Sequence, residues 1–293
     1  MVQSIFQFDF FALNEYRMDS FNDNLFNRRR QRHQSKLKHW RYAGLMLTYR
    51  CSAACRFCYY YCAPQAGGLM TTDTAINAWE GLIRLAGQNA KVHITGGEPF
   101  LYFDRLVEIL QQAHRLGLGP VDTVETNASW GEHSSQITDK LRQLDALGLN
   151  RLKISWDPFH EEFIDIQSVR DLLSAARSVL GPDRVLVRWE KHLEKPSGIR
   201  GKTESERLRI LQKALAADPC RLTGRAAETL ATLAPNHPIE HFREKKCQNA
   251  LLSAKGVHID PYGNVFNGQC SGMVIGNITQ TPLDVLWQLF EPD

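Results

Sequence analysis

The stretch CSAACRFCYYYC, residues 51–62, holds four of the seven cysteines of the chain. Its first three cysteines are Cys51, Cys55 and Cys58, separated by three residues and then by two. Tetrahedral zinc sites usually take two Cys-x-x-Cys pairs, whereas the thiolates of an iron–sulfur cluster surround a cube and can leave one iron without a protein ligand. Three cysteines at this spacing therefore favour an iron–sulfur cluster over a zinc site or three unrelated buried thiols.

Around this stretch, short apolar runs alternate with segments of helical period, which predicts repeated βα units and a parallel sheet. The predicted strands are residues 43–50, 91–95, 121–126, 151–156 and 184–190, and the predicted helices are residues 71–87, 103–116, 137–147 and 168–180. In such folds the loops at the carboxyl ends of the strands converge and carry the chemistry. The cysteine stretch follows the first strand, so we expect the functional site at this end.

The composition excludes several classes of protein. With 43% hydrophobic and 23% charged residues, the 293-residue chain is typical of a globular protein of about two domains. No apolar run approaches the roughly 20 residues of a membrane span, and residues 1–16 lack the basic start of a secretory signal. We therefore expect a cytoplasmic protein without a membrane partner, in which the cysteines do not form disulfides.

The strongest local charge is the basic run at residues 27–41. The formal net charge of +3 is too small to indicate nucleic-acid binding by itself. A solvated arm is the simpler interpretation of this run, and contact with a phosphate backbone or an acidic partner is the alternative. We expect no nucleic-acid partner.

The pattern Cys51-x-x-x-Cys55-x-Phe57-Cys58 resembles the cluster-binding loop of the radical S-adenosylmethionine (radical SAM) superfamily. The resemblance implies an α/β fold, a partial (β/α)6 TIM-like barrel in which the three cysteines hold a [4Fe-4S] cluster. It also implies that S-adenosylmethionine chelates the fourth iron through its amino and carboxylate groups. The aromatic ring of Phe57 is then expected to pack near the adenine.

A second motif, Gly96-Gly97-Glu98-Pro99, follows the second predicted strand and resembles the superfamily motif that hydrogen-bonds the methionine amino group. Glycines let the backbone approach a cofactor closely, and a carboxylate can accept hydrogen bonds from its ammonium group. Looser matches assign cofactor contacts to polar residues at later strand ends, namely Glu125, Thr126, Asn127, Ser155 and Arg188. Each of these also has a structural alternative, as a turn residue or an ion-pair partner.

The fourth strand is followed by WDPFHEEF, residues 156–163, which we interpret as a substrate-contact segment at the mouth of the barrel. Asp157 or His160 could orient or deprotonate a substrate, because a neighbouring acid moves the titration of a histidine. The alternative is that Trp156 and Phe159 pack under the rim and that the charges are solvated.

Three further cysteines, Cys220, Cys247 and Cys270, lie around a hairpin signal at residues 256–267. With the following Gly276-Asn277 pair and the earlier Gly224-Arg225 pair, they resemble the SPASM or twitch extension, which carries auxiliary iron–sulfur clusters. Three cysteines allow at most one cluster. Its fourth ligand could be Cys62, a residue other than cysteine, or an open site for substrate. Buried apolar cysteines are the alternative.

These observations predict an N-terminal extension at residues 1–42 and a barrel core at residues 43–195. Residues 196–293 are predicted to hold the remainder of the barrel and a small C-terminal auxiliary-cluster domain. The resemblance implies reductive cleavage of S-adenosylmethionine to a 5′-deoxyadenosyl radical that abstracts hydrogen from a substrate C–H bond.

The leading substrate is a ribosomally made peptide that undergoes net oxidation during its maturation. The alternatives are oxidation or rearrangement of a small metabolite such as an aminosugar and, from another class, a metal-stabilised nucleic-acid-binding module. The interpretation as a radical SAM enzyme also implies an electron donor such as flavodoxin or ferredoxin.

Overall fold

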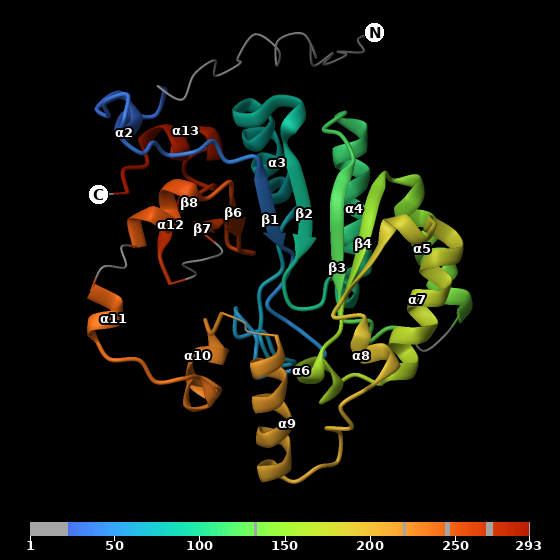
Figure 1. The fold of residues 1–293 in the computed structure, drawn as a ribbon. Helices are drawn as coiled ribbons and strands as arrows, with labels where there is room; N and C mark the ends of the chain where they lie inside the picture. The colour runs from blue at the N-terminus through green and yellow to red at the C-terminus, as the bar shows by residue number, and fades with distance from the viewer. Residues whose placement is uncertain (1–22, 132–133, 219–220, 244–246, 268–271, 293) are drawn as a thin grey trace, which may run out of the picture.

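The computed structural model describes residues 23–131, 134–218, 221–243, 247–267 and 272–292. One sheet of eight strands runs through them in the order β5-β4-β3-β2-β1-β6-β7-β8 (Figure 1). All neighbours from β5 to β6 are parallel, whereas β7 and β8 are added antiparallel. The strands are β1 (Tyr42–Met46), β2 (Lys91–Thr95), β3 (Val121–Thr126), β4 (Leu149–Ser155), β5 (Val185–Arg188), β6 (Gly256–Ile259), β7 (Asn264–Phe266) and β8 (Val274–Asn277).

The predicted α/β partial barrel is confirmed. Each of the five predicted strands is present. Strand β1 ends at Met46, four residues before the predicted end. Beyond it, Thr48 and Arg50 pair only as isolated bridges with the turn that follows the cysteines. The predicted hairpin is present as β6 and β7. Because β6 pairs with β1 in parallel register, the C-terminal part of the chain supplies a strand of the barrel sheet.

The main helices are α3 (Thr72–Ala86), α4 (Phe103–Arg115), α5 (Ser134–Ala146) and α7 (Ile166–Leu180), and they cover one face of the sheet (Figure 1). In α3, the Thr71 hydroxyl accepts a hydrogen bond from the Thr74 amide and caps the first turn. Trp79 and Leu82, which are almost fully buried, lie on its sheet-facing side. These helices match the four that the helical periods predict, with boundaries shifted by at most three residues.

The other helices are α2 (Leu25–Arg28), α6 (Pro158–Glu161), α8 (Lys191–Glu194), α9 (Glu204–Ala217), α10 (Arg225–Thr229), α11 (Glu240–Arg243), α12 (Cys247–Ser253) and α13 (Leu283–Leu289). Short 3-10 turns stand at Gly87–Asn89, Pro99–Tyr102, Pro182–Arg184 and Ala231–Leu233. Helices α6, α9 and α10 lie beyond the carboxyl ends of the parallel strands (Figure 1). None of the helices in the described ranges has both the length and the apolar character that a bilayer crossing requires.

The two faces of the sheet differ in chemistry because successive strand residues point to opposite sides. In β2, Val92 and Ile94 belong to the apolar core, whereas His93 and Thr95 line a cavity on the other face. The same alternation places Leu152 and Ile154 of β4 in the core. A polar face is thereby left available for a functional site.

Candidate active site

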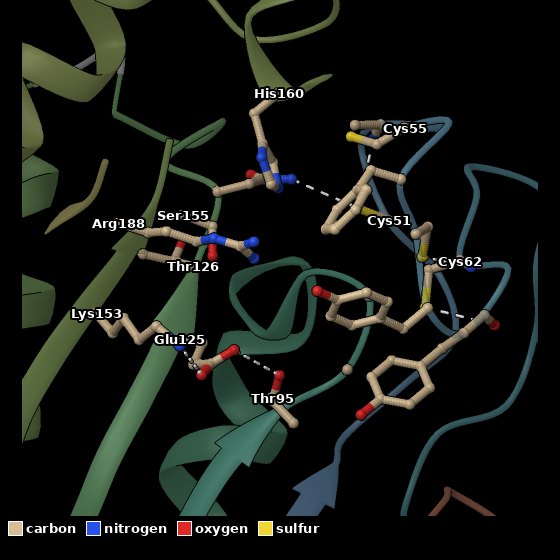
Figure 2. Close-up of a pocket in the computed structure, with 18 of the residues that line it drawn as sticks. Cys51, Cys55, Cys62, Thr95, Glu125, Thr126, Lys153, Ser155, His160 and Arg188 are labelled. Carbon is tan, nitrogen blue, oxygen red and sulfur yellow. Dashed lines mark hydrogen bonds and ion pairs between the residues drawn. The ribbon is translucent and has the colours of Figure 1, made fainter. Parts of the chain in front are cut away.

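A cavity of about 380 Å³ lies at the carboxyl ends of the parallel strands. One wall is the cysteine loop, residues 51–62, and the other walls come from the strands. Figure 2 shows the labelled cysteines on one side and Arg188, Ser155, Lys153 and Glu125 on the opposite side. The predicted site residues that line the cavity are Cys51, Cys55, Phe57, Cys58, Gly96, Gly97, Glu125, Asn127, Ser155, His160 and Arg188.

The three predicted cluster cysteines line this cavity with free thiols. Cys51 and Cys55 are buried, and Cys58 is half-buried. Burial raises the pKa of Cys51 to about 12 and that of Cys55 well above its usual value. Cysteine binds metals as the thiolate, so metal binding would release these protons. Three thiols in a shielded cavity are the donor set that a [4Fe-4S] cluster with one open iron requires.

The thiols are not arranged as they would be in a mononuclear site. In the described ranges, no three His, Cys, Asp or Glu side chains are placed to share a single metal ion. The thiolates of a cluster bind different irons, so their sulfur atoms need not meet at one point. The side-chain amide Nδ2 of Asn127 donates a hydrogen bond to Cys51 Sγ at 3.4 Å. Hydrogen bonds to the sulfurs are also found around iron–sulfur clusters. The residues present therefore fit a cluster.

The two glycines after β2 are required by close backbone contact. A Cβ atom at Gly97 would stand 1.9 Å from the carbonyl oxygen of Arg50, and Gly96 has a φ of +129°, which side-chain-bearing residues rarely adopt. The Gly97 amide donates to the Thr48 carbonyl at 2.6 Å, and the Glu98 amide donates to the Arg50 carbonyl at 2.9 Å. These contacts fix the end of β2 against the chain that leads into the cysteine loop.

The Glu98 carboxylate is fully buried and lies behind the cavity wall. It accepts hydrogen bonds from the backbone amides of Asn127 at 2.7 Å and Phe100 at 3.1 Å, and from the Thr126 hydroxyl at 2.9 Å. Burial raises its pKa to about 7. In this position Glu98 joins the ends of β2 and β3, whereas the predicted contact with the cofactor ammonium stays a prediction.

Glu125 forms the centre of a polar row across neighbouring strands. Its carboxylate accepts from Lys153 Nζ at 2.8 Å and from Thr95 Oγ1 at 3.0 Å (Figure 2). Burial alone would raise the pKa of Glu125, but attraction to His93, which is protonated only at low pH, and to the Lys153 ammonium holds it at about 2. The carboxylate is therefore ionised and paired, and its predicted cofactor contact would add to the existing bonds.

Ser155 and Arg188 are register partners at the ends of β4 and β5. Arg188 lies with its guanidinium 5.4 Å from the centre of the Phe57 ring, and Phe57 stacks on Phe159 at 4.8 Å. A guanidinium over an aromatic face is attracted by the ring. The cation at the end of β5 and the aromatic residue of the cysteine loop therefore form one side of the cavity.

Asp157 and His160 lie in contact with each other, although only His160 lines the cavity. Asp157 Oδ1 lies 2.8 Å from His160 Nδ1 and accepts from the backbone amides of Phe159 and His160, which caps α6. Burial opposes charge on both groups, but their mutual attraction lowers the pKa of Asp157 and raises that of His160. Trp156 and Phe159 are fully buried, as the alternative interpretation of this segment expected, but its expectation of solvated charges is wrong for Asp157, which is also fully buried.

Arg225 contacts the cysteine loop from helix α10. Its guanidinium donates to the carbonyls of Cys55 at 2.8 Å and Cys62 at 2.9 Å, and its amide donates to the Cys58 carbonyl at 3.0 Å. A Cβ atom on the preceding Gly224 would stand 2.1 Å from the Tyr59 carbonyl oxygen. Sequence reasoning noted this Gly-Arg pair but did not find the contact, because some 165 residues separate the partners.

Sequence reasoning missed the ring-bearing residues at the inner end of the cavity, Tyr42, His93 and His258, as well as Lys153. A signal was present in the strand KVHIT, residues 91–95, where period-2 alternation places His93 opposite the apolar residues. The strand of His258 was predicted only as part of a hairpin. Its pairing with β1 was therefore not foreseen.

The predicted ligands of an auxiliary cluster are described only in part. Cys220 and Cys270 lie outside the described residues, and the backbone of Cys247 begins α12. Cys62 lines the main cavity, where its amide donates to Cys58 Sγ at 3.3 Å. A second cluster in the C-terminal region stays a prediction.

Comparison with curated proteins finds two kinds of relative. The chain is 25% identical over 140 residues to YydG of Bacillus subtilis (strain 168), whose name links it to peptide biosynthesis; the match covers 46% of this chain and 41% of YydG. It is 30% identical over 128 residues to a GTP 3′,8-cyclase of Listeria monocytogenes, covering 41% of this chain and 34% of the cyclase. The matched region spans less than half the length of either relative.

Among solved structures, the fold is similar to that of BtrN, which was crystallised with AdoMet and 2-DOIA. The TM-score is 0.50 with 15% sequence identity, and the alignment covers 86% of this chain and 83% of BtrN. The family described as the Radical SAM superfamily matches residues 45–244, which include the cysteine loop and the carboxyl ends of β1 to β5. The chain therefore belongs to the radical SAM superfamily.

Proposed function

We propose that this radical SAM enzyme abstracts hydrogen from a C–H bond of a peptide and completes a net oxidation. The observation that carries the proposal is the convergence on one cavity of Cys51, Cys55 and Cys58 with the backbone of Gly96 and Gly97. The family implies a [4Fe-4S] cluster and S-adenosylmethionine. When bound, the cluster supplies the electron that splits S-adenosylmethionine into methionine and a 5′-deoxyadenosyl radical, which takes a hydrogen atom from the substrate.

The residues of the chain have distinct tasks in this proposal. Cys51, Cys55 and Cys58 hold the cluster, and the glycine backbone after β2 leaves space beside it. The polar strand ends, Glu125, Asn127, Ser155 and Arg188, orient the cofactor through hydrogen bonds and charge. An arrangement held this way keeps the reacting atoms in register, which lowers the entropic part of the barrier.

His160 is proposed to orient the substrate or move its proton. The ring lines the cavity and is fixed by Asp157 at 2.8 Å. The attraction of Asp157 raises the pKa of His160 against the effect of burial, so the ring stays protonated to a higher pH than an ordinary histidine. When protonated, it can donate to a substrate oxygen or return a proton. Asp157, which lies behind the ring, acts as the positioning residue.

The peptide substrate is supported by the match to YydG, whose name refers to peptide biosynthesis. We further propose a cytoplasmic enzyme with a SPASM- or twitch-like C-terminal region, in which an auxiliary cluster accepts the electron of the substrate radical. Flavodoxin or ferredoxin is the proposed donor to the first cluster. Together these assignments make the reaction an oxidation of the maturase type.

A small polar metabolite is the second candidate substrate. The match to GTP 3′,8-cyclase favours it, because the name of that enzyme specifies a small-molecule substrate and not a peptide. The nucleic-acid-binding module considered from the sequence is not favoured, since the family match includes both cofactor motifs.

The core of the proposal is tested by anaerobic reconstitution with iron and sulfide, followed by reduction with dithionite in the presence of S-adenosylmethionine. The wild-type protein is expected to release 5′-deoxyadenosine, detected by liquid chromatography with mass spectrometry. Variants with Ala at Cys51, Cys55 or Cys58 are expected to release none, because each thiolate holds one iron. Release of 5′-deoxyadenosine by any of these variants at the wild-type rate would falsify the assignment.

A further inference from the structure

The inner end of the cavity forms a second cluster of side chains, away from the cysteine loop. This inner pocket consists of Tyr42, His93, Thr95, Glu125, Lys153 and His258, all of which line the cavity. They come from β1, β2, β3, β4 and β6, so the pocket spans most of the barrel sheet. Except for Glu125, none of these residues takes part in the cofactor contacts proposed above.

Gly44 makes room for the two histidines. In the parallel registers of β1, Gly44 is the partner of both His93 and His258. A Cβ atom at Gly44 would stand 2.5 Å from His93 Cε1 and 2.4 Å from His258 Cδ2. Any side chain at this position would therefore displace both rings, and the glycine allows them to face each other at the inner end of the cavity.

The walls of the inner pocket are flat rings. Tyr42 stacks on His93 with ring centres 4.6 Å apart, and His93 meets His258 edge-on at 5.5 Å. Tyr60 of the cysteine loop lies 5.7 Å from His258. The buried Nδ1 atoms of both histidines have no hydrogen-bond partner within the described part of the chain. The rings therefore form a rigid wall that retains hydrogen-bonding capacity.

The charges of the inner pocket cancel. Glu125 and Lys153 form an ion pair at 2.8 Å, and Thr95 is uncharged. Burial lowers the pKa of His93 to about 4 and that of His258 to about 3, so both imidazoles are neutral at pH 7. A charged ligand would lose its hydration without gaining an unpaired counter-charge, which is costly.

We propose that the inner pocket binds an uncharged substrate group that both donates and accepts hydrogen bonds, a carboxamide or a hydroxyl. The inference rests on the proposed function, because it concerns the substrate of the same cavity. The Glu125 carboxylate presents an acceptor next to the Lys153 ammonium, which is a donor. A neutral imidazole carries one donor and one acceptor. An amide or hydroxyl group satisfies both kinds of partner, whereas a carboxylate or ammonium group satisfies only one.

The proposal is tested with a set of N-acetyl amino-acid methylamides that share one backbone. The cluster-reconstituted enzyme with S-adenosylmethionine, kept without reductant so that no turnover occurs, is titrated by ligand-observed NMR. The probes with Gln, Asn, Ser or Thr side chains are expected to bind at least tenfold more tightly than those with Asp, Lys or Leu. Preference for Gln or Asn assigns the carboxamide, and preference for Ser or Thr assigns the hydroxyl.

Two charge variants make the test specific to the inner pocket. Glu125→Gln leaves the Lys153 ammonium without its counter-charge, so the Asp probe is expected to bind about tenfold more tightly than to the wild type. Lys153→Met leaves the carboxylate unpaired and is expected to favour the Lys probe to a similar extent. If neither variant changes the charge preference, the probes bind elsewhere and the proposal is wrong.

A matched glycine pair tests the space in the pocket. Gly44→Ala is expected to weaken binding of the preferred probe at least tenfold, whereas Gly67→Ala, where a Cβ meets nothing within 4 Å, is expected to have no effect. A wild-type enzyme that cleaves S-adenosylmethionine but binds the Asp or Lys probe as tightly as the Gln and Ser probes would overturn this inference alone. Failure to cleave S-adenosylmethionine under reducing conditions would instead count against the proposed function.

Discussion

At the scale of single residues, burial determines which groups of the site carry charge. Glu125 stays ionised in the barrel because Lys153 compensates it, whereas His93 has no such partner and becomes neutral. The difference follows from the cost of desolvating a charge, which an opposite charge at hydrogen-bond distance offsets. The chemistry of the cavity is thus set by pairs of residues, and residue type alone does not determine it.

The buried histidines predict how stability depends on pH. The folded-state pKa of His93 lies near 4, below its ordinary value of about 6.5, so the unfolded chain binds a proton first as the pH falls. The contribution of the neutral ring to the free energy of unfolding is complete above pH 6.5 and is lost as the pH falls from about 6.5 to 4. At pH 5 this histidine has lowered the free energy of unfolding by about 2 kcal/mol. The melting temperature is expected to fall over this range.

The measurement is the melting temperature against pH for the wild type and for His93→Gln. The variant is expected to show a smaller decrease between pH 6.5 and 4, since one of the two buried imidazoles is gone. His114→Gln, at an exposed position of α4, serves as the control and should keep the wild-type slope. An unchanged slope in His93→Gln would show that the ring is not held neutral by burial.

At the scale of elements, the short helix α10 supports the cysteine loop from outside the barrel motif. Arg225 binds two carbonyls of the loop, and Thr229 donates to the Arg56 carbonyl at 2.9 Å. Hydrogen bonds from a charged donor contribute roughly 1.5–3 kcal/mol each. The position of the three thiols therefore depends on a segment that lies about 165 residues further along the chain.

A pair of glycine variants separates the effect of backbone strain from the effect of the close contact between α10 and the cysteine loop. Gly224 and Gly198 both have positive φ, near +58° and +65°, but a Cβ meets other atoms only at Gly224. Gly198→Ala is expected to cost about 1 kcal/mol of stability with normal iron uptake. Gly224→Ala is expected to reduce the iron bound after reconstitution by more than half, because the Tyr59 carbonyl must move. Equal iron content in the two variants would show that α10 does not position the loop.

At the scale of the whole molecule, the C-terminal part of the chain completes the barrel. Strand β6 pairs with β1, and its residue His258 enters the same cavity as the cysteine loop. Helix α13 is attached to α3 by the ion pair of Arg84 with Asp284 at 3.1 Å. The C-terminal region is therefore part of the sheet that encloses the cavity, whether or not it holds a second cluster.

The second cluster is tested in a variant with Ala at Cys51, Cys55 and Cys58. If the C-terminal cysteines bind a [4Fe-4S] cluster, this variant retains about four irons per chain after anaerobic reconstitution, with the Mössbauer signature of a cluster. This is the expected result under the oxidative proposal. Complete loss of iron, with the wild type still loaded, would contradict the auxiliary cluster and favour a redox-neutral rearrangement.

The sequence by itself determined the local features of this protein. The spacing of Cys51, Cys55 and Cys58 and the Gly96-Gly97 pair indicated the cofactors, because each motif is a short run of neighbouring residues that directly follows a predicted strand. Period-2 and period-3.6 patterns predicted the first five strands and the main helices. These patterns are also local, because hydrophobic periodicity reports how each segment faces the core.

Only the tertiary structure decided which distant residues complete the site. Gly44, His93 and His258 come from three strands, and they meet because parallel register aligns them. Likewise, Arg225 reaches the cysteine loop only because the fold brings helix α10 next to that loop. Such contacts join residues far apart in the sequence, and no local pattern records them. The family follows from the sequence, whereas the shape and charge of the inner pocket follow from the packing of the barrel.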